Sequence, residues 1–116
     1  MSKAIFRHGV GARLSEAAIF NGIVFLAGHV AEKTEGASLT EQTEEVLALL
    51  EDTLAQAGSR KERILSVQIF LTDISKIGEM NAVWDKWVAK GHSPARATVE
   101  AKLASPGYAI ETWRAA

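Results

Sequence analysis

Hydrophobic and polar positions alternate in the stretch that follows Pro94. A period of two residues is typical of a half-buried strand, because successive side chains point to opposite faces. A second strand is indicated at residues 109–115, and the Pro-Gly sequence in the intervening loop predicts an antiparallel hairpin with Leu103 opposite Tyr108. In the first strand the apolar set is Ala97, Val99, Ala101 and Leu103, and the polar set is Arg96, Thr98, Glu100 and Lys102.

Two short β-prone runs near the start of the chain predict another hairpin. They cover residues 17–20 and 23–27 and are separated by Asn21-Gly22. Asn-Gly is the preferred pair for a two-residue type I′ turn, in which both residues need positive φ. Residues 3–6 are expected to add a further strand.

Two segments show helical spacing of apolar residues. The first begins at Ser38, three residues before Glu41 in a capping-box arrangement, and stops at Gly58. Asp73 or Ser75 can cap the second, which ends at Gly91, and a strand at 64–72 lies between the two helices. The apolar stripes are Leu39, Thr43, Val46, Leu47, Leu50 and Leu54 in the first helix, and Ile77, Met80, Trp84, Trp87 and Val88 in the second.

This order of elements predicts an α+β fold in a single domain covering residues 1–116. Each helix connects two strands, and such crossovers pack their apolar stripes onto one face of a sheet. We therefore expect a mixed sheet of about six strands with both helices on one face. The opposite face is left without a helix, and the mixed second face of the 64–72 strand suits contact with another subunit.

The register of the final hairpin would place Arg96, Thr98, Glu100, Glu111 and Trp113 together on the face away from Ala97, Val99 and Ala101. Arg96 and Glu111 would be four positions apart, or about 13 Å at ~3.3 Å per residue. Two interpretations remain open at this point. The residues form a ligand site or interface on an uncovered sheet, or they are the ordinary polar face of an exposed strand.

Composition narrows the classes of function. The 116 residues carry a net charge of −1 with basic residues spread along the chain, which argues against a nucleic-acid-binding surface. No apolar run approaches the length of a membrane span, and the N-terminus lacks the apolar core of a signal peptide. The chain has no cysteine, hence no disulfide, thiol nucleophile or thiolate metal site. We expect a cytoplasmic protein.

No metal site or nucleotide site is expected. His8, His29 and His92 lie on separate elements without the spacing of a zinc site, so structural or solvent-facing roles are favoured. His29 follows Gly28 and is a candidate for lining a cleft. The GVGAR sequence at residues 9–13 lacks the strand–helix setting of a phosphate loop, and no serine has a G-x-S-x-G setting.

The segment HSPARATVEAKLASPGYAIE resembles the C-terminal signature of the reactive-intermediate deaminase family, also called Rid or YjgF-like. Members carry P-A-R-x-x-V-E and then I-E at this spacing. The resemblance continues upstream through FLAGHV, EQTEEVLALLEDTLAQAGS and ILSVQIFLTDISKIGEMNAVW, and it covers nearly the whole chain. The chain is most similar to a short, divergent subgroup.

The resemblance implies a chorismate-mutase-like fold and a homotrimer with ligand clefts between subunits. It implies hydrolysis of enamine or imine intermediates to 2-oxo acids and ammonia, without a cofactor. The partners would then be a small carboxylate substrate and further copies of the chain, with no nucleic acid and no membrane.

Site residues carry over by position in the same way. Arg96 matches the arginine that binds the substrate carboxylate, which a planar guanidinium grips through two parallel hydrogen bonds. Glu111 matches the acid that positions or activates water, and Thr98 a residue whose backbone places substrate and water. Gly28 matches a cleft glycine and Asn81 an asparagine at the cleft margin.

Two departures from the family pattern leave an alternative open. Leu14 stands where deaminating members commonly have tyrosine, and Ala27 where they commonly have serine. Loss of two hydrogen-bonding groups is compatible with a trimeric carboxylate-binding or regulatory protein that lacks the chemistry. RNA cleavage or translation inhibition, attached to some relatives, is disfavoured by the slightly acidic charge balance.

Overall fold

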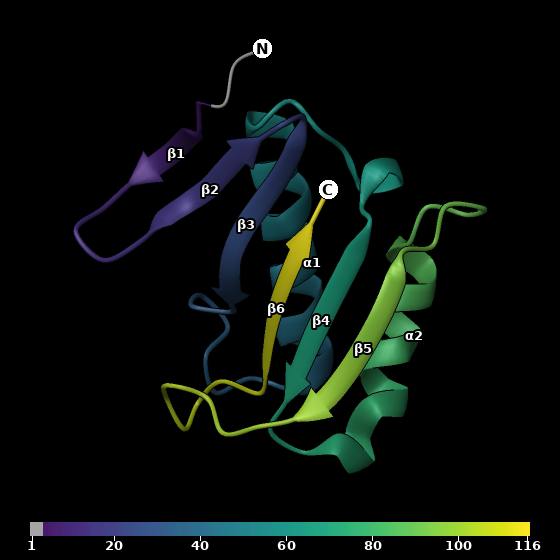
Figure 1. Ribbon diagram of the computed structural model, residues 1–116. Coiled ribbons are helices and arrows are strands. Elements are labelled where there is room, and N and C mark those ends of the chain that lie inside the picture. The colour runs from purple at the N-terminus through teal and green to yellow at the C-terminus, as the bar shows by residue number, and fades with distance from the viewer. Residues whose placement is uncertain (1–3) are drawn as a thin grey trace.

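The computed structural model describes residues 4–116 and shows a six-stranded mixed sheet with two helices on one face (Figure 1). The strand order is β1-β2-β3-β6-β4-β5. Short 3-10 turns at Lys61–Arg63 and Ile74–Lys76 precede β4 and α2. The strands are β1 (Phe6–Val10), β2 (Ser15–Phe20), β3 (Ile23–Val30), β4 (Ser66–Leu71), β5 (Ala95–Glu100) and β6 (Ile110–Ala115), and the helices are α1 (Leu39–Gln56) and α2 (Ile77–Trp87).

The N-terminal hairpin is confirmed. β2 and β3 pair antiparallel with Phe20 opposite Ile23, and Asn21 and Gly22 between them have φ of 52° and 79°, as a type I′ turn requires. The strand expected at residues 3–6 is misplaced, since β1 begins at Phe6, and Lys3 lies outside the described residues. The glycine-rich segment at residues 9–13 instead provides the end of β1 and most of the turn into β2.

Both helices form where the apolar spacing predicts them, but α2 ends at Trp87 and not at Gly91, because Val88 is already extended. Ser38 is the N-cap of α1 and accepts a hydrogen bond from the Glu41 amide at 3.1 Å. The Asp73 side chain accepts from the Ser75 amide and caps the 3-10 turn that leads into α2. Both helices pack on the same face of the sheet, behind the strands in Figure 1.

The predicted C-terminal hairpin is wrong. β5 does not pair with β6 but lies parallel to β4 at the edge of the sheet, with Arg96 in register with Val67. β6 lies between β3 and β4 and is antiparallel to both. The two C-terminal strands are thus separated by β4, as Figure 1 shows.

Burial explains this arrangement. Ile110, Thr112 and Arg114 are fully buried on the helix side of β6, which suits a central strand, whereas β5 is largely exposed, which suits an edge. The Pro-Gly turn does form, with the Tyr108 amide donating to the Ser105 carbonyl at 3.1 Å. The turn lies within the connection from β5 to β6, which is long enough to cross the end of β4. The strands on either side of the turn are therefore not paired with each other.

The buried side chain of Gln42 on α1 holds this connection in place. Its amide nitrogen donates to the carbonyls of Ala37 and Gly107, and its oxygen accepts from the Ala109 amide at 2.8 Å. The start of β6 is therefore fixed to the first turns of α1, which sets the register of the strand that carries Glu111.

The two faces of the sheet differ in composition. The helix side forms the apolar core, which includes Val67, Ile69 and Leu71 of β4. The opposite face leaves large apolar side chains exposed, among them Phe25 and Val99. Within residues 4–116, no helix has both the length and the apolar character that a membrane span requires.

Candidate functional site

Arg96 lies on the helix side of β5. It is in register with Val67, a core residue, and in-register neighbours in a sheet project to the same face. Its guanidinium carbon is 5.1 Å from the centroid of the Trp84 ring on α2, a cation–π contact. The prediction that Arg96 shares the open face with Glu111 and Trp113 is therefore wrong.

Two neighbours of Arg96 carry buried polar atoms without a hydrogen-bond partner. These atoms are the Thr98 hydroxyl on β5 and the Asn81 side-chain oxygen on α2. The only other such side-chain atom within residues 4–116 is Arg114 Nε. The Glu100 carboxylate accepts from the Ile74 amide at 3.1 Å, so β5 is anchored to the start of α2 there. Along β5, Thr98 lies between Glu100, which contacts Ile74, and Arg96, which contacts Trp84. Thr98 therefore faces the middle of α2, where Asn81 lies.

These unpaired atoms make the region a candidate polar site. Buried polar groups are nearly always hydrogen-bonded, so each exception calls for a partner such as water or a bound molecule. Arg96, Thr98 and Asn81 will be called the anchor half. It combines one exposed cation, which suits a carboxylate, with an unpaired hydroxyl and an unpaired amide oxygen, which accepts only from an N–H or O–H donor.

Glu111 lies on the open face of β6, opposite Val30 of β3 and Phe70 of β4. The predicted opposition of Glu100 and Glu111 does not occur, because the two strands are not paired. Between Leu26 and His29 the register of β3 shifts by one residue, so Ala27 and Gly28 form an irregularity beside Trp113. Such bulges re-aim side chains and are common next to functional sites.

The bulge gives the Glu111 carboxylate its position. A β-carbon built on Gly28 would collide with that carboxylate and lie 3.2 Å from its Cδ. The missing side chain of Gly28 thus makes room for Glu111. Gly28, Ala27 and Glu111 will be called the acid half, and it lies on the face of the sheet opposite to the anchor half.

We expect Gly28→Ala to displace the Glu111 carboxylate while leaving the fold intact. Gly28 is not among the residues with positive φ, and the atoms in the way are the end of a flexible side chain. The free energy of unfolding should change by no more than about 1 kcal/mol, whereas any turnover that depends on Glu111 should fall at least tenfold. Urea denaturation and steady-state kinetics of the same preparation test this. Equal activity in both proteins would contradict the role given to Gly28.

The other predicted lining residues lie near the acid half or at the edge of the sheet. Leu14 is 60% exposed in the β1–β2 turn, which is closed by a hydrogen bond from the Gly11 amide to the Leu14 carbonyl. Ala27 is half-buried and Trp113 is 40% exposed. No single face of the chain brings all the predicted residues together.

Comparison with known proteins decides the family. The profile of the family described as endoribonuclease L-PSP matches residues 7–116. The chain belongs to the L-PSP family, which is also called the YjgF or Rid family. A RutC family protein from Haemophilus influenzae is 48% identical over 100 residues, covering 86% of each chain. The RutC family protein YoaB from Escherichia coli is 40% identical over 107 residues, or 92% of each chain.

Solved structures of L-PSP family proteins confirm the predicted fold class. A YjgF family protein from Neisseria meningitidis superposes with a TM-score of 0.94 and 45% identity, covering 98% of this chain and 94% of that one. A protein from Salmonella typhimurium, described as a putative translation initiation inhibitor, has a TM-score of 0.89 and 38% identity, with 99% and 98% covered. The sheet of six mixed strands with two helices on one face is the architecture of this family.

Sequence reasoning missed a buried arginine in this L-PSP family protein. Arg114 is fully buried on the helix side of β6, and its guanidinium donates to the carbonyl and hydroxyl of Thr112 at 3.0 and 3.2 Å and to Nδ1 of His29. Burial lowers its pKa to about 9. The alternation Ile110, Thr112, Arg114 could have located it, because these three residues share one face of the strand.

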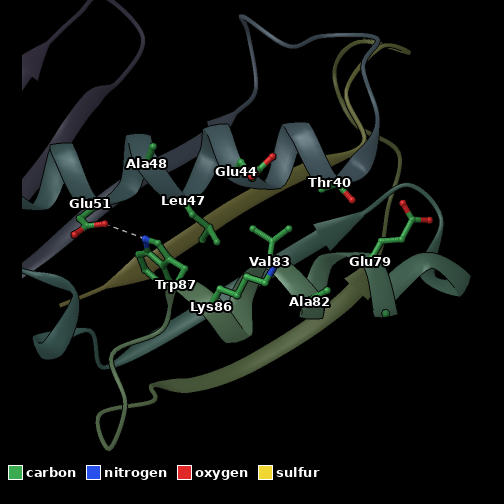
Figure 2. A pocket seen from close by; sticks show the side chains of 11 residues that line it. Thr40, Glu44, Leu47, Ala48, Glu51, Glu79, Ala82, Val83, Lys86 and Trp87 are labelled. Carbon is green, nitrogen blue, oxygen red and sulfur yellow. Dashed lines mark hydrogen bonds between the residues drawn. The ribbon is translucent and has the colours of Figure 1, made fainter.

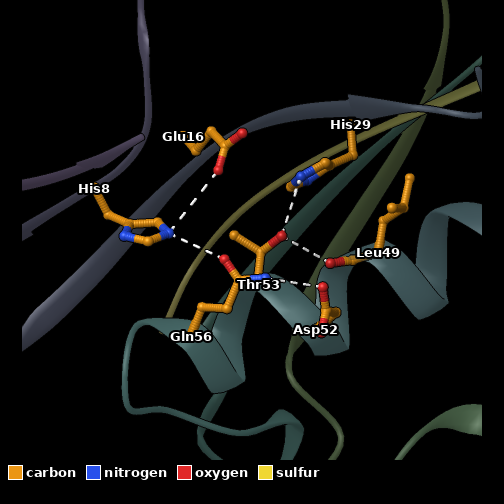
Figure 3. Close-up of polar contacts among 7 residues, drawn as sticks. All are labelled: His8, Glu16, His29, Leu49, Asp52, Thr53 and Gln56. Carbon is orange, nitrogen blue, oxygen red and sulfur yellow. Dashed lines mark hydrogen bonds and ion pairs between the residues drawn. The ribbon is translucent and has the colours of Figure 1, made fainter. Parts of the chain in front are cut away.

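His29 is held neutral by burial and by the nearby Arg114 cation, and Figure 3 shows its contact with Thr53. Its Nδ1 accepts from Arg114, so its Nε2 carries the proton and faces the Thr53 hydroxyl at 3.4 Å, while that hydroxyl donates to the Leu49 carbonyl at 2.8 Å. Burial and the Arg114 cation lower the pKa of His29 to about 4. His29 therefore points to α1 and connects β3 with β6 and α1 through these hydrogen bonds.

This lowered pKa makes stability depend on pH. In the unfolded chain His29 takes up a proton near its ordinary pKa of 6.5, whereas in the folded chain it does so only near 4. Stability should therefore fall as the pH drops from 6.5 to 4. His29→Asn keeps an acceptor for Arg114 and removes the titration, so its stability should fall less over this range. Urea denaturation at both pH values measures the difference, and parallel losses in the two proteins would contradict the assignment.

His8 belongs to a polar cluster between β1, β2 and α1. Its Nε2 lies 3.0 Å from the Gln56 side-chain oxygen and 4.0 Å from the Glu16 carboxylate (Figure 3). A pocket of about 330 Å³ opens here over Gly28 and His29. In the described part of the chain, no cluster of three or more His, Cys, Asp or Glu side chains is arranged to hold a metal ion.

Proposed function

We propose that this protein hydrolyses 2-imino acids and their enamine tautomers to 2-oxo acids and ammonia. The observation that supports this most directly is the pair of incomplete half-sites. One holds a cation beside two unused polar groups, and the other holds a carboxylate placed over a glycine. The substrate supplies what each half lacks, namely a carboxylate for the first and an electrophilic carbon for the second.

Arg96 is the carboxylate anchor in this proposal. A guanidinium binds a carboxylate through two parallel N–H groups, a geometry that lysine cannot reproduce. The guanidinium lies over the Trp84 ring, and its N–H groups make no hydrogen bond or ion pair within residues 4–116, so they are available to a carboxylate. The unpaired atoms of Thr98 and Asn81 can then bind the substrate nitrogen or the attacking water.

Glu111 is the acid–base group. It removes a proton from water as the oxygen attacks the C2 carbon of the imine, and the C=N double bond becomes a C–N single bond. The same carboxyl group then returns that proton to nitrogen, which gives a carbinolamine. It next takes the proton of the C2 hydroxyl group and passes it to nitrogen as the C–N bond breaks, so that ammonia leaves and the C2 carbonyl forms. Such positioned proton transfer typically contributes about 10²–10⁴ in rate. The reaction consumes only water, so the proposal includes no cofactor.

The two halves can meet only if two copies of the chain share a site. Arg96 faces the helix side at the outer edge of the sheet, while Glu111 faces the open side. Exposed apolar residues on the open face, including Phe25 and Trp113, suit contact with a neighbouring copy. The proposal is therefore a homotrimer, as the family resemblance implies, acting in the cytoplasm where pyridoxal-phosphate enzymes release such imines.

The activity is tested by generating the imine in situ. An amino-acid oxidase or a pyridoxal-phosphate dehydratase supplies 2-imino acids, and formation of the 2-oxo acid is followed with and without the protein. We expect a faster rise that scales with protein concentration. Rates equal to those in buffer across several imines would contradict the proposal.

A binding protein without chemistry is the second candidate. Leu14 and Ala27 favour it, because neither residue can donate the hydrogen bond that tyrosine or serine would provide. In that case a 2-oxo acid should raise the melting temperature of the protein and not that of Arg96→Ala, while imine hydrolysis stays at the background rate. Turnover above background would exclude this candidate.

A further inference from the structure

A groove of about 690 Å³ runs between α1 and α2 on the solvent side of the helix pair (Figure 2). Its floor is apolar, with Leu47 of α1 facing Val83 of α2, and Trp87 lies at one end. The small residues Ala48 and Ala82 also line the groove. Val83 and Trp87 are partly exposed in it, whereas Leu47 is only 2% exposed. This volume lies within the range of pockets that bind small organic molecules.

The rim of the groove is acidic. Glu44 and Glu51 stand on α1, Glu79 stands on α2, and Lys86 is the one basic residue among the lining side chains. Neither the Glu44 carboxylate nor the Glu79 carboxylate makes a hydrogen bond or an ion pair with any residue from 4 to 116. No ion pair among these residues therefore neutralises either charge. α1 reinforces this field, since the segment Leu39–Gln56 contains five acidic residues and no lysine or arginine.

The aromatic end of the groove is rigid. The indole nitrogen of Trp87 donates to the Glu51 carboxylate at 3.0 Å and links the two helices, as the dashed line in Figure 2 shows. The Lys61 ammonium donates to the Trp87 carbonyl at 2.7 Å and lies 5.2 Å from the centroid of its ring. Both contacts fix the ring, so an apolar ligand meets a prepared surface instead of a mobile side chain.

We propose that this groove binds a small organic cation with an apolar body, such as an arylalkyl ammonium. The ammonium group pairs with Glu44 and Glu79 at the open end, and the apolar body covers Leu47 and Val83 toward Trp87. Anions are repelled by the same carboxylates. The site uses none of the residues assigned to imine hydrolysis and does not depend on that function.

The proposal is tested on the full chain by NMR titration with three probes of matched shape. These are phenethylammonium, 2-phenylethanol and 3-phenylpropanoate, and the readout is the indole N–H signal of Trp87, assigned with Trp87→Phe. Phenethylammonium should shift this signal with saturation, bind at least threefold more tightly than the alcohol and lose affinity with added salt. The carboxylate should leave the signal unchanged.

Charge variants on the same helices provide matched controls. Glu44→Gln and Glu79→Gln should each weaken phenethylammonium binding about threefold, and Lys86→Gln should strengthen it by a similar factor. Asp52→Asn makes the same charge change on α1 outside the groove and should have no such effect. Equal binding of the alcohol would show a merely apolar docking surface and overturn the proposal. So would binding of the carboxylate, equal weakening by Asp52→Asn, or no saturation at millimolar probe.

Discussion

Arg96→Ala should lower kcat/KM for 2-imino acids by about 30- to 4000-fold. Removing one partner of a hydrogen-bonded charge pair costs about 2–5 kcal/mol, and each 1.4 kcal/mol corresponds to a factor of ten. The effect should appear mainly in KM, because the guanidinium holds the substrate carboxylate in the ground state as well as in the transition state. Steady-state kinetics over a range of imine concentrations measures it.

Two further variants make this result specific to the anchor. Arg96→Lys keeps the charge and loses the bidentate geometry, so it should recover only part of the activity. Arg60→Ala removes an exposed charge at the start of a 3-10 turn, away from both halves, and should behave as the unmodified protein. Full activity in Arg96→Ala would show that the carboxylate is bound elsewhere.

Glu111→Gln should lower kcat by about 10²-fold or more and leave KM nearly unchanged. Glutamine preserves the shape that fits over Gly28 but cannot take a proton from water. A loss confined to kcat would identify Glu111 as part of the chemical step and not of substrate binding. Glu62→Gln, an equivalent change at an exposed position in a 3-10 turn, is the control. A kcat within a few-fold of the original would remove Glu111 from the mechanism.

Local sequence signals predicted the local structure well. The Asn21-Gly22 turn and the cap at Ser38 each depend on a few adjacent residues, and both are confirmed. The pairing of the last two strands depends instead on which sheet edges are already occupied. β5 completes a parallel unit with β4 and leaves the other edge of β4 free, and β6 fills that edge. No turn motif encodes this competition between edges.

The same error misplaced Arg96. Its alternation with apolar neighbours correctly predicted a strand, but the register that assigned its face came from the wrong partner strand. The family resemblance supplied the candidate residues and implied clefts between subunits, but it did not indicate which residues belong to which half. Arg114 was overlooked because a charged residue is rarely fully buried, although its position in the alternation of β6 pointed to the core.

The central claim is that each catalytic site joins the anchor half of one chain to the acid half of another. Mixing Arg96→Ala and Glu111→Gln chains under conditions that exchange subunits tests it most directly. If sites are shared, about a quarter of them contain both intact halves, so the mixture should recover about a quarter of the unmodified activity from two nearly inactive parents. A mixture no more active than the average of its parents, with exchange verified by mass, would contradict the account.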